Sequence, residues 1–216
     1  IGTKATIGQS LMAQSLGADV LSIIAPSFAA ASQNEIYEHY RTIAEAVKTP
    51  IVLYNIPART GNAIAPATVA RLSRIDMIRG AKDSSGNFDN MLQYIELTRG
   101  VDFSVLSGND SLILWNLLAG GKGGIAGCAN VYPRTMASIY DLFAAGDLAK
   151  AREAQDSIRP FRNCFKFGNP NTIVKTAAAL LGYPVGKCRA PFNSVSEEGL
   201  EALKRVMAEN EAKGMR

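Results

Sequence analysis

Short apolar runs recur along the first 130 residues of the chain, each bounded by residues that favour turns. They cover residues 20–24, 51–54, 77–82, 103–107 and 124–127. Runs of this length, separated by stretches with a helical pattern, are typical of the parallel strands of an α/β fold. The pattern alone does not distinguish a closed barrel from an open doubly wound sheet.

The gaps between these runs carry the periodicity of amphipathic helices. The clearest helix covers residues 33–46, because Ser32 and Glu35 form a capping box at its start. We expect further helices at residues 62–73, 88–98 and 111–119, the last capped by Asp110.

Beyond Pro133 the strand pattern stops and only helical patterns remain. The sequence therefore predicts two domains, a strand–helix domain over residues 1–132 and a helical domain over residues 133–216. In the second domain we expect helices at residues 134–144, 148–164, 172–181 and 197–213.

The number of strand–helix units is smaller than a closed barrel needs. At about 30 residues per unit, residues 1–132 hold five units, whereas a (β/α)8 barrel has eight. Ile1, Gly2 and Thr3 read as the end of a further strand. We therefore expect part of a longer polypeptide, a barrel whose first strands lie outside this chain, and we expect activity to require those strands.

Composition narrows the function classes. The chain has 47% hydrophobic and 19% charged residues and a net charge of +4, with scattered Lys and Arg, which argues against a nucleic-acid partner. No apolar run reaches the ~18–20 residues of a membrane span, so we expect no membrane contact.

Cys128, Cys164 and Cys188 are far apart and fit a reducing cytoplasm. A single histidine, His39, excludes His-based metal sites, and no G-x-G-x-x-G motif follows a strand. We therefore expect no metal and no bound cofactor.

Lys82 ends the third predicted strand, and Asp83 and a Ser-Ser-Gly-Asn turn follow it. A strand does not continue easily through such a turn, so Lys82 is expected at the carboxyl end, where barrel enzymes place their active sites. Apolar surroundings favour the neutral amine, which can attack a carbonyl and form a Schiff base. The alternative is an ordinary surface lysine that opens a loop.

Tyr54 and Arg59 follow the preceding strand in the same way. Tyr54 ends residues 51–54, so its hydroxyl is expected one strand away from Lys82, close enough to relay a proton. Arg59 lies in the loop beyond and offers a planar guanidinium suited to a carboxylate. Taken alone, these two residues could equally be a strand aromatic and a solvated loop residue.

Five sequence strings, taken together, resemble the dihydrodipicolinate synthase and N-acetylneuraminate lyase superfamily in the family's order. They are Y-N-I-P-A-R-T-G at 54–61, G-A-K-D-S-S-G-N at 80–87, L-S-G-N-D at 106–110, G-G-I-A-G-C-A-N at 123–130 and N-P-N-T-I-V-K at 169–175. The resemblance implies a (β/α)8 TIM barrel with a C-terminal helical domain, assembled as a homo-oligomer, a dimer of dimers. It also implies a cytoplasmic lyase.

The resemblance assigns roles to four residues. Lys82 is similar to the Schiff-base lysine that takes pyruvate or a related 2-keto acid, and Tyr54 to the tyrosine that shuttles protons. Ile125 is similar to the residue whose backbone lies near the bound keto acid. Arg59 resembles the arginine with which dihydrodipicolinate synthases hold aspartate semialdehyde, so the implied partners are a small 2-keto acid and an aldehyde.

Two departures from the synthase pattern keep alternatives open. The pattern P-Y-Y appears here as Pro26-Ser27-Phe28, so the tyrosine that completes a relay in the neighbouring subunit is replaced by Phe28. The G-T-T-G-E segment is not in this chain. Asp83 after the lysine is also familiar among 2-keto-3-deoxy sugar acid aldolases. A sugar acid aldolase or dehydratase, an N-acetylneuraminate lyase-like enzyme, and a non-catalytic binding relative therefore remain as alternatives.

Overall fold

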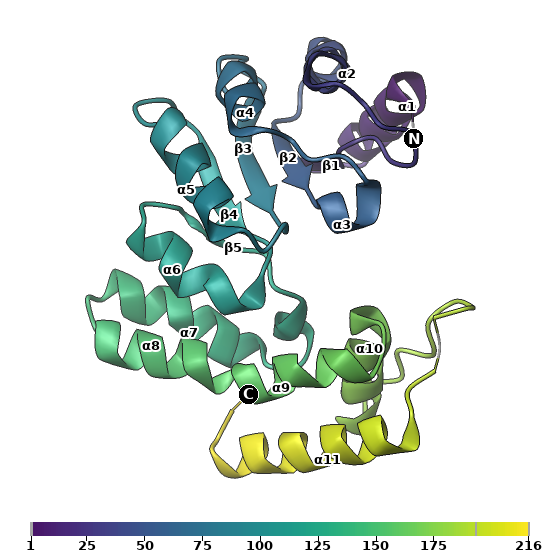
Figure 1. The fold of residues 1–216 in the computed structure, drawn as a ribbon, viewed down its shortest axis with the longest axis vertical. Coiled ribbons are helices and arrows are strands. Elements are labelled where there is room, and N and C mark those ends of the chain that lie inside the picture. The colour runs from purple at the N-terminus through teal and green to yellow at the C-terminus, as the bar shows by residue number, and fades with distance from the viewer. Residues whose placement is uncertain (1, 193, 216) are drawn as a thin grey trace. The chain divides into compact units, whose positions relative to one another are not determined.

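Five parallel strands form one sheet in the computed structural model, which describes residues 2–192 and 194–215. Each strand pairs with the next one along the chain (Figure 1). The strands are β1 (Leu21–Ile24), β2 (Ile51–Asn55), β3 (Ile78–Asp83), β4 (Ser104–Ser107) and β5 (Gly123–Gly124). Each predicted run overlaps one strand, although β2 and β3 end one residue later than predicted and β5 begins one residue earlier. β5 is also shorter than residues 124–127, and a 3₁₀ helix begins at Gly127.

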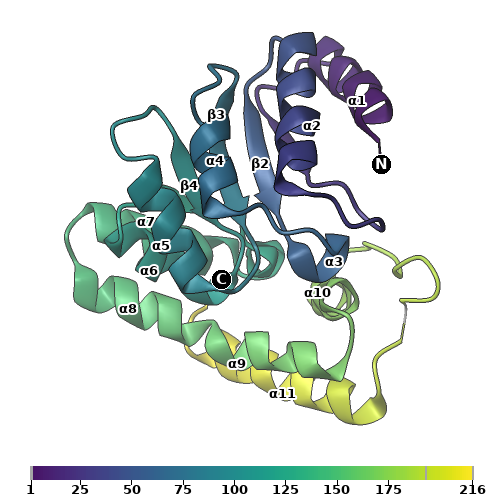
Figure 2. The ribbon, with the colours of Figure 1, turned by 45° about the horizontal axis from the view of Figure 1, so that its top comes forward.

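Helices cover one face of this sheet in chain order, as Figures 1 and 2 show for α2, α4 and α5. The helices before β5 are α1 (Thr3–Ser15), α2 (Gln33–Ala46), α3 (Pro57–Thr60), α4 (Pro66–Leu72), α5 (Phe88–Leu97), the 3₁₀ helix η1 (Asp110–Leu112) and α6 (Ile113–Leu118). The predicted capping box opens α2: the Ser32 hydroxyl accepts a hydrogen bond from Glu35 N, and the Glu35 carboxylate accepts one from Ser32 N.

The expectation of a strand end at Ile1, Gly2 and Thr3 is wrong for the described residues. Gly2 is the N-cap of α1, and Thr3 is its first helical residue, while Ile1 lies outside the described residues. The stretch beyond Thr3 is rich in Ala, Gln, Leu and Met, which favour helix.

Two predicted helix starts also differ from the structure. The helix expected at residues 62–73 starts at Pro66, whose fixed φ and missing N–H suit the first helical position. The cap expected from Asp110 is Asn109, whose Oδ1 accepts a hydrogen bond from Ser111 N, and Asp110 is the first residue of η1.

Alternating burial along the strands separates two faces of the sheet. In β2, Ile51, Leu53 and Asn55 are buried, whereas the side chains between them are half-buried. Tyr40 from α2 is buried in the same core and donates its hydroxyl to Ile23 O at 3.0 Å. Successive strand residues point to opposite faces, so the residues between the core positions face the other side of the sheet.

The chain divides into two units, Ile1–Ile125 and Ala126–Arg216, and the second is helical. The sequence places its domain boundary slightly later, at 132/133. The second unit contains η2 (Gly127–Asn130), α7 (Pro133–Ala144), α8 (Leu148–Ser157), α9 (Arg159–Asn163), η3 (Cys164–Phe167), α10 (Pro170–Leu180) and α11 (Glu197–Ala212).

The core of the second unit is built on aromatic contacts. Tyr132 and Phe161 meet edge to face with ring centroids 5.3 Å apart, and Asn210 donates to the Tyr132 hydroxyl at 3.1 Å. The single helix expected over residues 148–164 is wrong: α8 ends at Ser157, and Pro160 stands in the first turn of α9. Proline lacks the N–H that a continuous helix needs. None of the described helices is long and apolar enough to cross a membrane.

Candidate active site

Tyr54 and Lys82 lie in contact at the carboxyl ends of β2 and β3. They are Cα partners in the parallel pairing, and Lys82 Nζ lies 3.9 Å from the centroid of the Tyr54 ring. The carboxyl ends of β2 and β3 lie side by side (Figure 1). The predicted juxtaposition of these two residues is therefore confirmed, and the face of an aromatic ring attracts the ammonium group at this distance.

The turn after Lys82 ends the strand as the sequence predicts, one residue later than expected. β3 ends at Asp83. The Asp83 carboxylate accepts a hydrogen bond from Ser85 N at 2.9 Å, the local bond by which aspartate forms a turn. Gly86 then adopts φ +78°, a conformation that glycine reaches without strain.

The Lys82 stem packs closely against the backbone of β4's carboxyl end. A Cβ added at Gly108 would lie 2.9 Å from Lys82 Cε and 1.9 Å from Ser84 Oγ. A side chain at position 108 would therefore require both Ser84 and Lys82 to move. Ser84 Oγ is itself buried without a hydrogen-bond partner among the described residues, so an unpaired hydroxyl lies beside the lysine stem.

Arg59 lies on α3, five residues beyond Tyr54, and is exposed. Its guanidinium has neither an ion pair nor a hydrogen bond within residues 2–192 and 194–215. The short helix that carries it ends at Gly61, which adopts φ +78°. Arg59 is thus free to bind an anion, although the structure does not bring it into contact with Lys82.

Hydrogen bonds connect the loop after β1, which contains Phe28, to the residues that follow Arg59. Asn62 donates through Nδ2 to Pro26 O at 2.9 Å and to Ala29 O at 2.8 Å, and accepts from Ala31 N at 2.8 Å. Phe28 N also donates to Thr60 O at 3.2 Å. Phe28 is fully exposed and has φ +83°, which is uncommon for a bulky residue.

Ile125 lies just beyond β5, at the edge of the sheet where β3 and β4 end. Its N donates to Ser107 O at 2.8 Å, and Ser107 is the Cα partner of Asp83. The side chain is 45% exposed. The four residues singled out from the sequence therefore all lie at or beyond the carboxyl ends of strands, and of these only Tyr54 and Lys82 are seen in contact.

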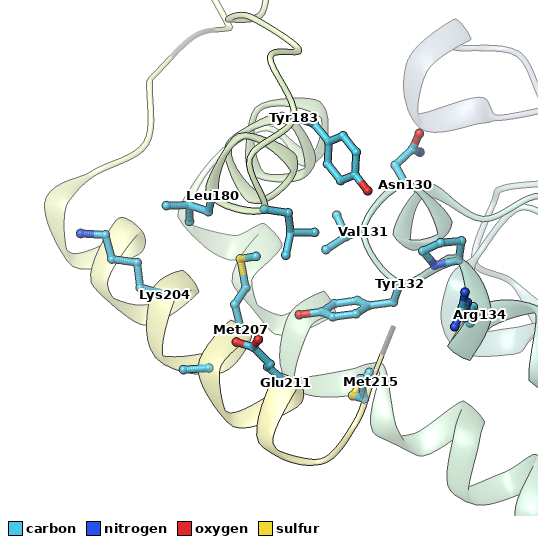
Figure 3. A pocket seen from close by; sticks show the side chains of 13 residues that line it. Asn130, Val131, Tyr132, Arg134, Leu180, Tyr183, Lys204, Met207, Glu211 and Met215 are labelled. Carbon is cyan, nitrogen blue, oxygen red and sulfur yellow. The ribbon is translucent and has the colours of Figure 1, made fainter.

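A cavity of about 710 Å³ lies within the helical unit, and none of these four residues lines it (Figure 3). Tyr132 and Met207 point into it from opposite walls, and Leu180 and Tyr183 line another side. Tyr132 is largely buried, and burial raises the pKa of its hydroxyl. The lysine of this lining, Lys204, forms an ion pair with Glu201 and points away from Tyr132 and Tyr183 (Figure 3), so we do not assign the chemistry to this cavity. Over the described residues, no cluster of three or more His, Cys, Asp or Glu side chains could hold a metal ion.

Known proteins of one family match almost the whole chain. The profile of the Dihydrodipicolinate synthetase family matches residues 2–210. The 4-hydroxy-tetrahydrodipicolinate synthase of Syntrophus aciditrophicus is 42% identical over 195 residues, which cover 90% of this chain and 67% of the relative.

Solved structures give the same result for the fold. The 4-hydroxy-tetrahydrodipicolinate synthase of Methylacidiphilum fumariolicum SolV superposes with a TM-score of 0.94 at 31% identity, over 98% of this chain and 71% of that one. YagE, an E. coli K12 prophage protein of the same family in complex with pyruvate, superposes with a TM-score of 0.91 at 28% identity, over 97% and 72%. The parallel sheet, its outer helices and the C-terminal helices follow the (β/α)8 barrel and helical domain predicted from the sequence. The chain belongs to the Dihydrodipicolinate synthetase family.

Proposed function

We propose that this protein is a Schiff-base lyase of the 4-hydroxy-tetrahydrodipicolinate synthase type, which condenses pyruvate with aspartate semialdehyde in lysine biosynthesis. The contact between Lys82 Nζ and the Tyr54 ring carries the proposal. It places an amine nucleophile and a phenolic proton donor together at the strand ends of a family fold. The names of the relatives support the choice of substrates.

The chemistry needs only these groups and the two substrates. The Lys82 amine adds to the C2 carbonyl of pyruvate, and loss of one water gives an iminium. A proton then leaves C3, and the resulting enamine attacks the aldehyde carbon to form the new carbon–carbon bond. Tyr54 transfers protons to and from the reacting oxygens. Attack of the semialdehyde's amino group on the iminium carbon closes the ring and releases Lys82. No metal or bound cofactor is required.

The remaining site residues bind rather than react. The unpaired Arg59 guanidinium is suited to the carboxylate of the semialdehyde, because its planar fork matches two carboxylate oxygens. Ile125, held by its N–H to Ser107 O, presents backbone near the keto acid.

A 2-keto-3-deoxy sugar acid aldolase or dehydratase is the second candidate, and one observation favours it. Phe28 has no hydroxyl to complete the proton relay of the synthases. Such an enzyme would use the same Lys82 iminium but release or bind a polyhydroxylated aldehyde.

Phe28 also supports assembly with further copies of the chain. A fully exposed phenylalanine with a left-handed backbone is stabilised where a partner removes it from water, by about 1.5–3 kcal/mol for a phenylalanine side chain. We therefore propose a homo-oligomer, a dimer of dimers, located in the cytoplasm, where the free Cys128, Cys164 and Cys188 stay reduced.

Reductive trapping tests the proposed function. Pyruvate with borohydride should convert the Lys82 iminium into a stable secondary amine, which peptide mass spectrometry detects. The label should disappear in Lys82→Ala and persist in Lys122→Ala, a matched exposed lysine of the same unit. Absence of any label would favour the non-catalytic binding relative, and faster turnover of a keto-deoxy sugar acid than of aspartate semialdehyde would favour the aldolase.

A further inference from the structure

A second polar pair lies directly behind Tyr54 and Lys82. Asn55 follows Tyr54 on β2, Asp83 follows Lys82 on β3, and these two residues are also Cα partners. Because successive strand residues point to opposite faces, Asn55 and Asp83 lie on the helix-covered face. Both are buried, with Asp83 0% and Asn55 1% exposed.

The Asp83 carboxylate is bound by neutral donors from three elements. Its Oδ2 accepts from Asn55 Nδ2 at 3.0 Å and from Asn90 Nδ2 of α5 at 2.7 Å. Its Oδ1 accepts from the N–H and the hydroxyl of Ser85, at 2.9 and 2.5 Å. No ion pair to Asp83 is found among the described residues. A buried carboxylate is costly unless its hydrogen bonds are complete, so these four donors together keep it in place.

Asn55 connects this carboxylate to the strand that carries Tyr54. Its Oδ1 accepts from Ile64 N at 3.0 Å, and its carbonyl accepts from Ser84 N at 2.8 Å. On the other side of β3, Asp83 O accepts from Gly108 N at 2.7 Å. The backbones at the ends of β2, β3 and β4 are thus bound together at the level of Asn55 and Asp83.

We infer that Asp83 is a positioning residue for the reaction, which acts through Asn55 on Tyr54. This inference rests on the proposed function and extends it. The Tyr54 ring meets Lys82 Nζ only while β2 and β3 keep their register, because a shift of one residue moves each side chain to the other face. The Asp83–Asn55 bond adds a side-chain link to the backbone ladder at the last pair before both strands end.

The chemistry of the carboxylate explains why an asparagine at position 83 would not serve. The substitution Asp83→Asn keeps the size of the side chain but leaves it only one acceptor oxygen. The new amide N–H groups would face the donors that bound the lost oxygen, and these hydrogen bonds cannot form. A displacement of about 1 Å at reacting groups can cost about 10²-fold in rate. Loss of the bond should therefore lower turnover more than it weakens substrate binding.

Two matched substitutions separate positioning from general stabilisation. Asn55→Ala and Asn90→Ala each remove one amide that donates to the same oxygen, Asp83 Oδ2. Only Asn55 belongs to the strand that carries Tyr54, while Asn90 belongs to α5. Their kcat, their KM for pyruvate and their melting temperatures should be measured beside those of the wild type, together with Asp83→Asn if that variant folds.

We expect Asn55→Ala to lower kcat by about 30–100-fold, the scale set by small displacements of reacting groups, with KM for pyruvate changed less than about threefold. Asn90→Ala should keep kcat within about fivefold of the wild type. Equal losses in the two variants, or a loss in Asn55→Ala that appears only in KM, would overturn the inference. Borohydride labelling of Lys82 in the wild type is the companion measurement. The absence of this label overturns the proposed function itself. If the label is present and Asn55→Ala and Asn90→Ala lose kcat equally, only the role of Asp83 is overturned.

Discussion

Gly108→Ala probes how closely the Lys82 stem is packed. The added methyl would meet Lys82 Cε at 2.9 Å and Ser84 Oγ at 1.9 Å, both shorter than any ordinary contact. The backbone φ of Gly108 lies outside the left-handed region, and its N–H to Asp83 O would remain. The substitution therefore acts by steric contact alone.

The two distances set the expected size of the effect. Neither atom can stay in place, and overpacking of this kind costs about 1–3 kcal/mol of stability. Displacement of the Lys82 amine by about 1 Å would lower the rate of Schiff-base formation by about 10²-fold. The assay is the rate at which pyruvate and borohydride label Lys82, followed by peptide mass spectrometry, with thermal unfolding measured in parallel.

Two further variants test the cause. Gly8→Ala, in the exposed part of α1 with nothing within 4 Å of the added Cβ, should label at the wild-type rate. In Gly108→Ala combined with Ser84→Ala, the closest clash is gone, so part of the lost rate should return; the pair should be strongly non-additive. Wild-type labelling by Gly108→Ala alone would refute the close packing of the lysine stem.

Four more expectations follow from the same site and its surroundings. Tyr54→Phe should lower turnover by about 10²–10⁴-fold with unchanged folding, and a loss below about tenfold would leave Tyr54 a packing residue. Arg59→Ala should raise the KM for aspartate semialdehyde far more than that for pyruvate, so equal changes would contradict its role. Phe28→Asp should dissociate the oligomer in sedimentation experiments if this residue is an intersubunit contact. Burial lowers the pKa of His39, so the unfolded chain takes up a proton more readily than the folded protein. The melting temperature should therefore fall as the pH drops through about 6.5, and this dependence on pH should be weaker in His39→Gln.

The sequence predicted those parts of the site that follow from strand order. In a barrel, consecutive parallel strands are adjacent and end at one edge, so Tyr54 and Lys82 were expected to be neighbours once that fold was inferred. The start of the helix 33–46 was predicted to the residue because its capping box is local. By contrast, Ser84, Gly108 and Asp83 gain their importance from atoms on other strands and on α5, and no short sequence pattern records such contacts. The break in the helix at residue 158 was missed because apolar periodicity continued past Pro160.

The hydrogen bonds of Asn62 connect the loop after β1 to the segment that follows α3. Its amide holds Pro26 and Ala29 on one side and lies two residues from Thr60 on the other. A displacement of Phe28 would therefore pull on the end of the short helix that carries Arg59, through Asn62 and through the hydrogen bond from Phe28 N to Thr60 O. A contact made by Phe28 at the protein's surface and the anion site proposed at Arg59 would in this way be coupled.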